Sequence, residues 1–230
     1  MIAGVNVSFP IITVDGPSGA GKGTLCHALA RRYGFHLLDS GAIYRIGALA
    51  SQTIGIDLDD EEAVASLCER LEVDFVPTEN GVSVMLNGQD VSQLLRTENV
   101  GMAASKIAAY PKVREALVNC QRNFAKSPGL VADGRDMGTT IFPAANAKIF
   151  LTASAEDRAR RRVDQLLSIG CPASFEQILA DIKARDYNDC ARTISPLQPA
   201  DDALVIDSSQ MTIDGVCQQV NDYLKSLSLV

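Results

Sequence analysis

The chain has 230 residues, of which 47% are hydrophobic and 21% charged, values that fit a soluble globular protein with a large buried core. Its net charge of −7 argues against general nucleic-acid binding, because proteins that bind the phosphate backbone carry basic surfaces. Six cysteines without CxxC spacing argue against a zinc site or a disulfide framework. The first seven residues lack a signal-peptide pattern and no apolar run approaches a membrane span, so we expect a cytoplasmic protein.

Apolar runs and helical patterns alternate from the N-terminus. Residues 9–14 predict a central strand, 25–33 a helix and 35–39 a second strand, and Ser40 is expected to be the N-cap of the next helix. The segment 57–100 departs from this alternation of buried strands and helices. After a helix over 59–70, two alternating runs predict a β-hairpin, with strands at 73–76 and 82–86 and a turn at 78–81.

Helical periodicity returns over 98–124, with a break at Tyr110-Pro111. The remaining predicted elements are strands at 130–132, 147–152 and 203–207 and helices at 155–168, 174–190 and 212–227. Strands that alternate with helices predict an α/β fold, a three-layer sandwich with helices on both faces of a central parallel five-stranded sheet. The hairpin region is a small antiparallel β insert in this pattern.

A glycine-rich loop that ends in lysine, residues 14–24, joins the first strand to the first helix. Backbone N–H groups of such a loop converge on phosphate oxygens, and the lysine reaches the β- and γ-phosphates of a nucleoside triphosphate. The bland alternative is a glycine-rich turn without a ligand. The predicted ATP-binding residues of the loop are Gly16, Pro17, Ser18, Gly19, Ala20, Gly21, Lys22, Gly23 and Thr24.

The residue after the lysine departs from the common form of this loop. Gly23 stands where a Ser or Thr would ligate magnesium, and the hydroxyl moves one residue on, to Thr24. We therefore expect Mg²⁺ to be held mainly by water, phosphates and a carboxylate from elsewhere. The Gly-Lys-Gly-Thr ending is more typical of nucleoside monophosphate kinases than of GTPases or motor ATPases.

Polar side chains follow several predicted strands, and ligands gather at the carboxyl ends of strands in parallel sheets. Asp39 and Ser40 follow the second strand, and the segment 133–136 (Asp-Gly-Arg-Asp) follows the third. Two carboxylates and a guanidinium on one tight loop predict a binding site. One carboxylate could organise Mg²⁺ or its bound water, while the other recognises polar groups at the edge of a substrate. A solvated turn is the alternative.

Arg185, Asp189 and Arg192 have the spacing that places side chains on one face of a helix. Arginines positioned by a carboxylate suit a phosphate clamp, because a guanidinium binds phosphate oxygens through two parallel hydrogen bonds. An exposed helix with ordinary salt bridges is the alternative.

A second group of arginines lies just upstream. Arg158 shares a helix face with Arg161 or Arg162, and together with 185–192 they flank residues 163–184. This arrangement predicts a lid, which phosphoryl transfer needs for positioning, charge neutralisation and exclusion of water.

Weaker signals lie between these motifs. Tyr44 and Arg45 suit contacts with a base or ribose and with an acceptor phosphate, although Tyr44 in the core is an equally good interpretation. Ser105 and Arg114 lie on helical segments where a serine is normally a filler residue.

Four motifs in this order resemble the bacterial cytidylate kinases over nearly the whole chain. They are Asp15-Gly-Pro-Ser-Gly-Ala-Gly-Lys-Gly-Thr24, Leu38-Asp-Ser-Gly-Ala-Ile-Tyr-Arg45, Asp133-Gly-Arg-Asp-Met-Gly138 and Arg185-Asp-x-x-Asp189-x-x-Arg192. The first alone is weakly specific, whereas the four together are highly specific. The antiparallel insert at about 63–100 also resembles the enlarged monophosphate-binding domain of this family.

The resemblance implies transfer of the ATP γ-phosphoryl group to CMP or dCMP, giving CDP or dCDP in pyrimidine nucleotide metabolism, with Mg²⁺. It implies a single P-loop kinase domain over 1–230. Its parts would be a core (9–39, 105–157 and 192–230), a nucleoside-monophosphate-binding region with the β insert (40–104) and a helical lid (158–191). We expect a monomer that binds small nucleotides, without nucleic-acid or membrane partners.

The resemblance also implies roles for individual residues. Lys22 and its loop would hold ATP phosphates together with Arg158 and Arg161. Ser40, Ser105, Arg114 and Asp136 would read cytosine, Asp133, Arg185 and Asp189 would hold the sugar, and Arg45, Arg135 and Arg192 the phosphate. The catalytic residues would be Lys22, Arg135, Arg185 and Arg192, and the CMP site would consist of Asp39, Ser40, Tyr44, Arg45, Ser105, Arg114, Asp133, Arg135, Asp136, Arg185, Asp189 and Arg192.

Base chemistry agrees with the cytosine assignment. Cytosine presents an N4 amino donor beside the acceptors N3 and O2, which a carboxylate and an arginine complement. Uracil would leave Asp136 facing a carbonyl, and a buried mismatch of that kind costs more than a lost contact. Two alternatives remain open, a kinase of another acceptor on the same scaffold and a non-catalytic nucleotide-binding switch.

Overall fold

The structure is a computed structural model that describes residues 9–78, 81–168 and 170–230. Residues 79 and 80, at the centre of the predicted hairpin turn, and the N-terminal segment compared with a signal peptide lie outside the described residues. The chain forms two compact units. The first consists of Met1–Phe35 and Ser127–Val230, and the second of His36–Lys126.

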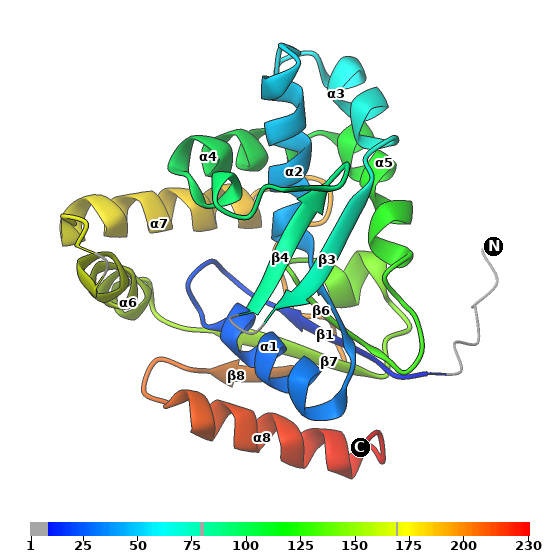
Figure 1. Cartoon of the computed structure of the whole chain (residues 1–230). Coiled ribbons are helices and arrows are strands. Elements are labelled where there is room, and N and C mark those ends of the chain that lie inside the picture. The colour runs from blue at the N-terminus through cyan, green and yellow to red at the C-terminus, as the bar shows by residue number, and fades with distance from the viewer. Residues whose placement is uncertain (1–8, 79–80, 169) are drawn as a thin grey trace. The chain divides into compact units, whose positions relative to one another are not determined.

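The first unit is built on parallel strands (Figure 1). Its elements are β1 (Ile11–Asp15), α1 (Lys22–Tyr33), β6 (Leu130–Gly134), one π-helical turn (Met137–Ile141), β7 (Ala147–Thr152), α6 (Ala155–Ser168), α7 (Phe175–Cys190), β8 (Leu204–Asp207) and α8 (Ile213–Ser226). β1 pairs in parallel with β6 and with β7, and β7 pairs in parallel with β8. All five residues of β1 are buried, which explains the continuous apolar run before Asp15.

The central sheet has five strands in the order β2-β6-β1-β7-β8, where β2 (His36–Asp39) is the strand with which the second unit begins. The predicted five-stranded parallel sheet is thereby confirmed. α1 and α8 lie side by side, as do α6 and α7 (Figure 1). Val216, Val220 and Leu224 of α8 are buried, and their spacing of four residues explains the amphipathic pattern that predicted this helix.

The second unit combines helices with a small antiparallel sheet. Beyond β2 its elements are α2 (Ser40–Thr53), α3 (Glu61–Cys68), β3 (Val73–Thr78), β4 (Gly81–Leu86), β5 (Gln89–Asp90), a 3₁₀ turn (Leu94–Arg96), α4 (Glu98–Ile107) and α5 (Pro111–Arg122). The sheet order β3-β4-β5 with antiparallel pairing confirms the predicted insert. A cluster of Ile46, Val91, Leu95 and Val100 forms part of the core of this unit.

Several helices begin at side chains that accept a backbone hydrogen bond. Asp60 caps α3 through the Ala63 N–H, and Ser174 caps α7 through the Gln177 N–H. The prediction that Ser40 caps α2 is wrong by one residue. Asp39 is the N-cap, since its carboxylate accepts from the Ala42 N–H at 3.0 Å, while Ser40 is the first residue of the helix.

Candidate active site

The glycine-rich loop lies between the end of β1 and the start of α1 in the first unit. Lys22, Gly23 and Thr24 are the first three residues of α1, and the helix has Gly21 as its N-cap with no side-chain hydrogen bond to the first turn. The N–H groups of this turn have no partner within the helix, and the positive end of the helix dipole adds to them. The loop therefore has the form of a phosphate-binding site.

Gly16 opens this loop where the chain passes very close to β7. Its φ is +146°, and a Cβ on this residue would lie 1.9 Å from the carbonyl oxygen of Leu151. A side chain at this position would collide with the sheet backbone. The tight bend after β1 thus depends on a residue without a side chain.

Lys22 is buried, with 8% of its surface exposed. Its ammonium group donates to the Pro17 carbonyl at 3.0 Å and lies 3.8 Å from Oδ1 of Asp133. Burial lowers the pKa of Lys22 from its usual value, and the Asp133 charge opposes this shift. The structure thus brings the predicted phosphate-loop lysine together with the first carboxylate of the predicted 133–136 loop.

The predicted loop at 133–136 begins two residues later than expected, because Asp133 and Gly134 are the last residues of β6. They lie next to the phosphate loop, since Asp15 of β1 is in register with Gly134. Asp136 is buried, with 4% exposed, while Asp133 and Arg135 are half-buried. Asp15, for which no role was predicted, also belongs to this region. Its carboxylate accepts the N–H groups of Met137 and Gly138, both at 2.8 Å.

Asp189 joins two of the predicted phosphate-binding arginines. Its carboxylate, 1% exposed, accepts from Nε of Arg135 and from a guanidinium nitrogen of Arg192. The expectation that Arg192 continues the helix face is wrong, because α7 ends at Cys190. The turn after the helix brings Arg192 back to Asp189. Two guanidinium groups on one carboxylate form a site with net positive charge, which suits a phosphate.

Arg158 and Arg161, predicted to reach ATP phosphates, have other partners in this structure. Arg158 is buried and donates to the carbonyls of Ser18 and Ala153, each at 3.0 Å, and to both oxygens of Asp186. Arg161 donates to the Ser208 carbonyl. Arg185 lies on α7, half-buried.

The other predicted CMP-site residues belong to the second unit. Arg114 is buried, donates to the Ala108 carbonyl at 3.1 Å and places its guanidinium 5.7 Å from the ring centre of Tyr44. Tyr44 is also buried, as the core interpretation of this residue expects. Ser40 donates to the Gln121 side chain at 2.8 Å, and Ser105 lies on α4, half-buried.

Arg45 contacts the segment before α4. One guanidinium nitrogen donates to the Leu95 carbonyl at 2.7 Å. A Cβ on Gly101 would lie 3.0 Å from this guanidinium, so the side chain rests directly on α4.

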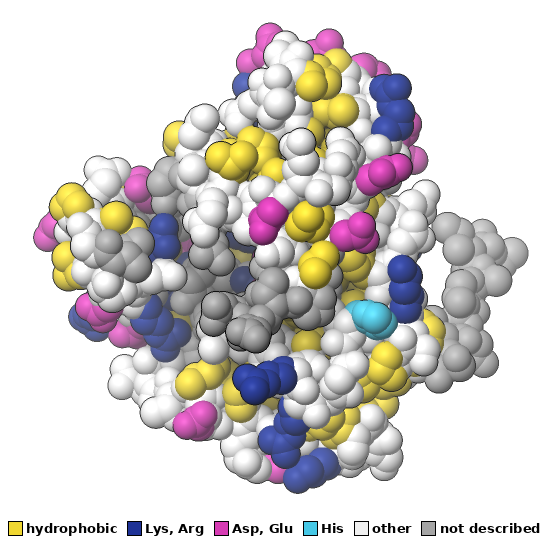
Figure 2. All heavy atoms as spheres, viewed as in Figure 1, with side chains coloured by type: hydrophobic (Ala, Val, Ile, Leu, Met, Phe, Trp, Pro, Cys, Tyr) yellow, Lys and Arg dark blue, Asp and Glu magenta, His cyan; other side chains and the backbone are white. Residues whose placement is uncertain are grey.

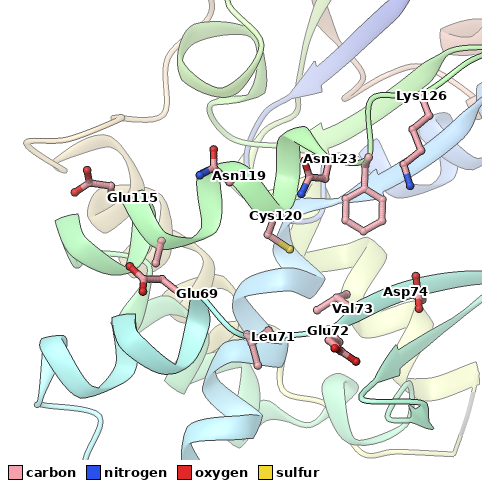
Figure 3. A pocket seen from close by; sticks show the side chains of 12 residues that line it. Glu69, Leu71, Glu72, Val73, Asp74, Glu115, Asn119, Cys120, Asn123 and Lys126 are labelled. Carbon is pink, nitrogen blue, oxygen red and sulfur yellow. The ribbon is translucent and has the colours of Figure 1, made fainter.

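A cavity of about 770 Å³ in the second unit contains none of the predicted site residues. It lies between the segment after α3, the start of β3 and the second half of α5 (Figure 3). Its charged lining consists of Glu69, Glu72, Asp74, Glu115 and Lys126. The excess of carboxylates makes it unsuited to a nucleotide phosphate.

On the face that Figure 2 shows, Lys and Arg side chains lie in small separate groups among acidic and apolar ones. Within the described ranges, no group of three or more His, Cys, Asp or Glu residues has the arrangement of a metal site. None of the helices in those ranges is long and apolar enough to cross a membrane.

Comparison with known proteins decides the family. The family model described as cytidylate kinase matches residues 12–226. The chain belongs to the cytidylate kinase family. The match spans all four motifs, including both residues of the Lys22–Asp133 pair and the Arg135–Asp189–Arg192 group.

Curated members of the cytidylate kinase family are similar over nearly their whole length. The cytidylate kinase of Vibrio cholerae is 57% identical, covering 94% of this chain and 96% of the relative. That of Proteus mirabilis is 55% identical, covering 96% and 98%. Among solved structures, a shikimate kinase from Acinetobacter baumannii aligns over 97% of each chain with a TM-score of 0.45 and 17% identity, a likeness too distant to bear on function.

Proposed function

We propose that this protein is a nucleoside monophosphate kinase that transfers the γ-phosphoryl group of ATP to CMP and dCMP, forming CDP and dCDP in pyrimidine nucleotide metabolism. The observation that carries the proposal is the arrangement in the first unit. The ammonium group of Lys22, in the phosphate loop, lies 3.8 Å from a carboxylate oxygen of Asp133. Arg135 follows two residues after Asp133, and Asp189 forms ion pairs with both Arg135 and Arg192. Donor-phosphate and acceptor-phosphate groups thus lie on adjoining segments.

Each group has a distinct task in the proposed reaction. Lys22 and the N–H groups of the first turn of α1 hold the β- and γ-phosphates of ATP, and Arg158 and Arg161 of the lid add positive charge. Arg135, Arg192 and Arg45 hold the acceptor phosphate, and Asp133, Arg185 and Asp189 hold the sugar. The acceptor is already an anion, so alignment and neutralisation of charge suffice and no general base is required.

The base is read by Asp136 with Arg114, Ser105 and Ser40. Asp136 is buried, and a carboxylate in such a place accepts the N4 amino group of cytosine. Uracil presents a carbonyl there, and two facing acceptors in a buried site are strongly unfavourable. Asp39 and Tyr44 complete this part of the proposed site.

A magnesium ion accompanies ATP in the proposed reaction. In this proposal the ion is held chiefly by phosphate oxygens and water, because Gly23 stands where a Ser or Thr hydroxyl would otherwise bind it. A carboxylate from elsewhere in the site completes its surroundings in this proposal. When bound, the ion neutralises charge on the phosphates during transfer.

We further propose a cytoplasmic monomer whose partners are ATP and the pyrimidine monophosphates. Its parts are the core (9–39, 105–157 and 192–230), the acceptor-binding region (40–104) and the lid (158–191).

A survey of acceptors tests the function. ADP release is measured with ATP, Mg²⁺ and, in turn, CMP, dCMP, UMP, AMP and shikimate. We expect the largest kcat/KM with CMP or dCMP. A higher value with AMP, UMP or shikimate would overturn the assignment of the acceptor, and nucleotide binding without acceptor-dependent turnover would identify a switch protein instead.

A further inference from the structure

Asp15 is a buried carboxylate at the junction between β1 and the phosphate loop. It is the last residue of β1, only 5% of its surface is exposed, and each of its oxygens accepts one backbone N–H of the segment after β6. The donors are Met137 and Gly138, both at 2.8 Å. Burial of a charge is costly, so a carboxylate in this place needs such partners.

The two N–H groups belong to the start of the π-helical turn. In this turn the Thr140 and Ile141 N–H groups donate back to the Asp136 carbonyl. The first N–H groups of any helical turn lack partners within the turn itself. Asp15 supplies both acceptors, and it thereby fixes the backbone directly after Arg135 and Asp136.

Gly138 is the residue that allows the carboxylate to approach. A Cβ at this position would lie 2.9 Å from Oγ1 of Thr13, 3.2 Å from Cδ of Lys148 and 3.3 Å from Oδ2 of Asp15. Side chains of two strands, β1 and β7, therefore enclose this residue. The contact between β1 and the π-turn therefore depends on the carboxylate of Asp15 and on the absence of a side chain at Gly138.

The charge of Asp15 matters for this contact. A carboxylate offers an acceptor oxygen to each N–H group, whereas an amide side chain of the same shape offers one oxygen and turns an NH₂ group toward the other donor. An asparagine at this position would leave one buried N–H group facing a donor. Loss of one of two hydrogen bonds would then release the backbone that carries Asp136.

We propose that Asp15 is a positioning residue for the acceptor nucleotide, which holds the 135–138 segment so that Arg135 meets Asp189 and Asp136 faces the base. This inference rests on the proposed function of that segment. Asp15 itself touches no nucleotide in this scheme.

The test compares Asp15→Asn and Gly138→Ala with the wild type by KM for the acceptor and KM for ATP. We expect each variant to raise the acceptor KM about tenfold, the size expected when a buried N–H group loses its acceptor, and to change the ATP KM less than about twofold. The double variant should be little worse than either single variant, because both changes break one contact. Asp222→Asn is the matched control, since Asp222 is exposed on α8, where its carboxylate accepts from the Gln218 side chain away from Gly138; its KM values should not change.

The variants are assayed with the acceptor that the wild type uses best. A wrong CMP assignment would therefore appear in the acceptor survey of the wild type, independently of what the variants show. Unchanged acceptor KM in a folded variant, or equal losses for ATP and acceptor, would overturn the positioning role. If Asp15→Asn does not fold, the KM values of Gly138→Ala for the acceptor and for ATP test the positioning role. If neither folds, the contact serves the fold as a whole and the inference is wrong.

Discussion

Arg158 of α6 and Asp186 of α7 form a two-pronged ion pair, in which one guanidinium nitrogen meets Oδ1 at 3.0 Å and the other meets Oδ2. The same guanidinium donates to the Ser18 carbonyl in the phosphate loop. A single side chain therefore links both lid helices with the loop proposed to bind ATP. Arg158 would have to exchange these partners in order to reach a phosphate directly.

The Arg158–Asp186 pair should contribute strongly to stability. Arg158 is 3% exposed, and Arg158→Lys keeps the charge but loses the planar fork that binds two oxygens. We expect a loss of about 2–3 kcal/mol in the free energy of unfolding, measured by urea titration. Arg160→Lys is the control in the same helix, because its pair with Asp157 is exposed and should be worth less than about 0.5 kcal/mol. Equal effects of the two substitutions would contradict this prediction.

Lys22→Met should abolish most turnover while the protein remains folded. The ammonium group lies against the Pro17 carbonyl and near Asp133, where its charge serves the phosphates in the proposed reaction. Removal of one such donor lowers kcat by about 10²–10³-fold in enzymes that stabilise charge in this way. Lys183→Met, an exposed lysine paired with Glu156 on α6, should leave kcat unchanged. Full turnover in a folded Lys22→Met protein would refute the role of Lys22.

Asp136→Asn should impair use of the acceptor more than use of ATP. The amide presents a donor where the N4 amino group of cytosine needs an acceptor, so the KM for CMP should rise about tenfold or more and the preference for CMP over UMP should narrow. KM values for ATP, CMP and UMP provide the measurement. Equal losses for ATP and CMP would assign Asp136 to the organisation of magnesium instead.

Asp15 should make stability depend on pH. Burial raises its pKa from 3.8 to about 6, with a contribution from the Asp136 charge, while the two backbone hydrogen bonds and Lys22 act in the other direction. The folded protein therefore holds this proton more tightly than the unfolded chain. The resulting stabilisation is complete below about pH 4 and is lost as the pH rises through about 6.

The total size of this effect follows from about 1.4 kcal/mol for each pKa unit, which gives about 3 kcal/mol, most of it lost between pH 4 and pH 7. It is measured as the difference in unfolding free energy between the wild type and Asp15→Asn at several pH values. The wild type should lose stability relative to the variant across this range. Parallel curves for the two proteins would show that Asp15 titrates at an ordinary pKa.

The sequence predicted the local elements of this fold well, because each has a clear period or boundary signal. The break at Tyr110-Pro111 separates α4 from α5, with Pro111 at the start of α5, where a proline fits. The N-cap of α2 was misplaced because Asp39 and Ser40 are both good capping residues and no local rule chooses between them. The position of Arg192 was misjudged because helical spacing says nothing of where the helix ends.

The contacts between distant segments could not be predicted. Asp15 and Gly138 are 123 residues apart and Arg158 and Ser18 are 140 apart, so both contacts depend on the register of β1 against its neighbours and on the packing of the lid helices. The sequence shows Asp15 only as the residue before a glycine-rich loop. Its double hydrogen bond becomes visible once β1 and β6 are paired.

Gly16 has a consequence for how substitutions in the phosphate loop are interpreted. The space for a side chain there is already occupied by the Leu151 carbonyl of β7, so the sheet, and not the bound phosphate, excludes every other amino acid from this position. A variant at Gly16 would separate two hydrogen-bonded strands before any nucleotide arrives. If such a variant lost ATP binding, the cause would be a disrupted sheet. If a Lys22 variant lost ATP binding, the cause would be the missing positive charge at the phosphates.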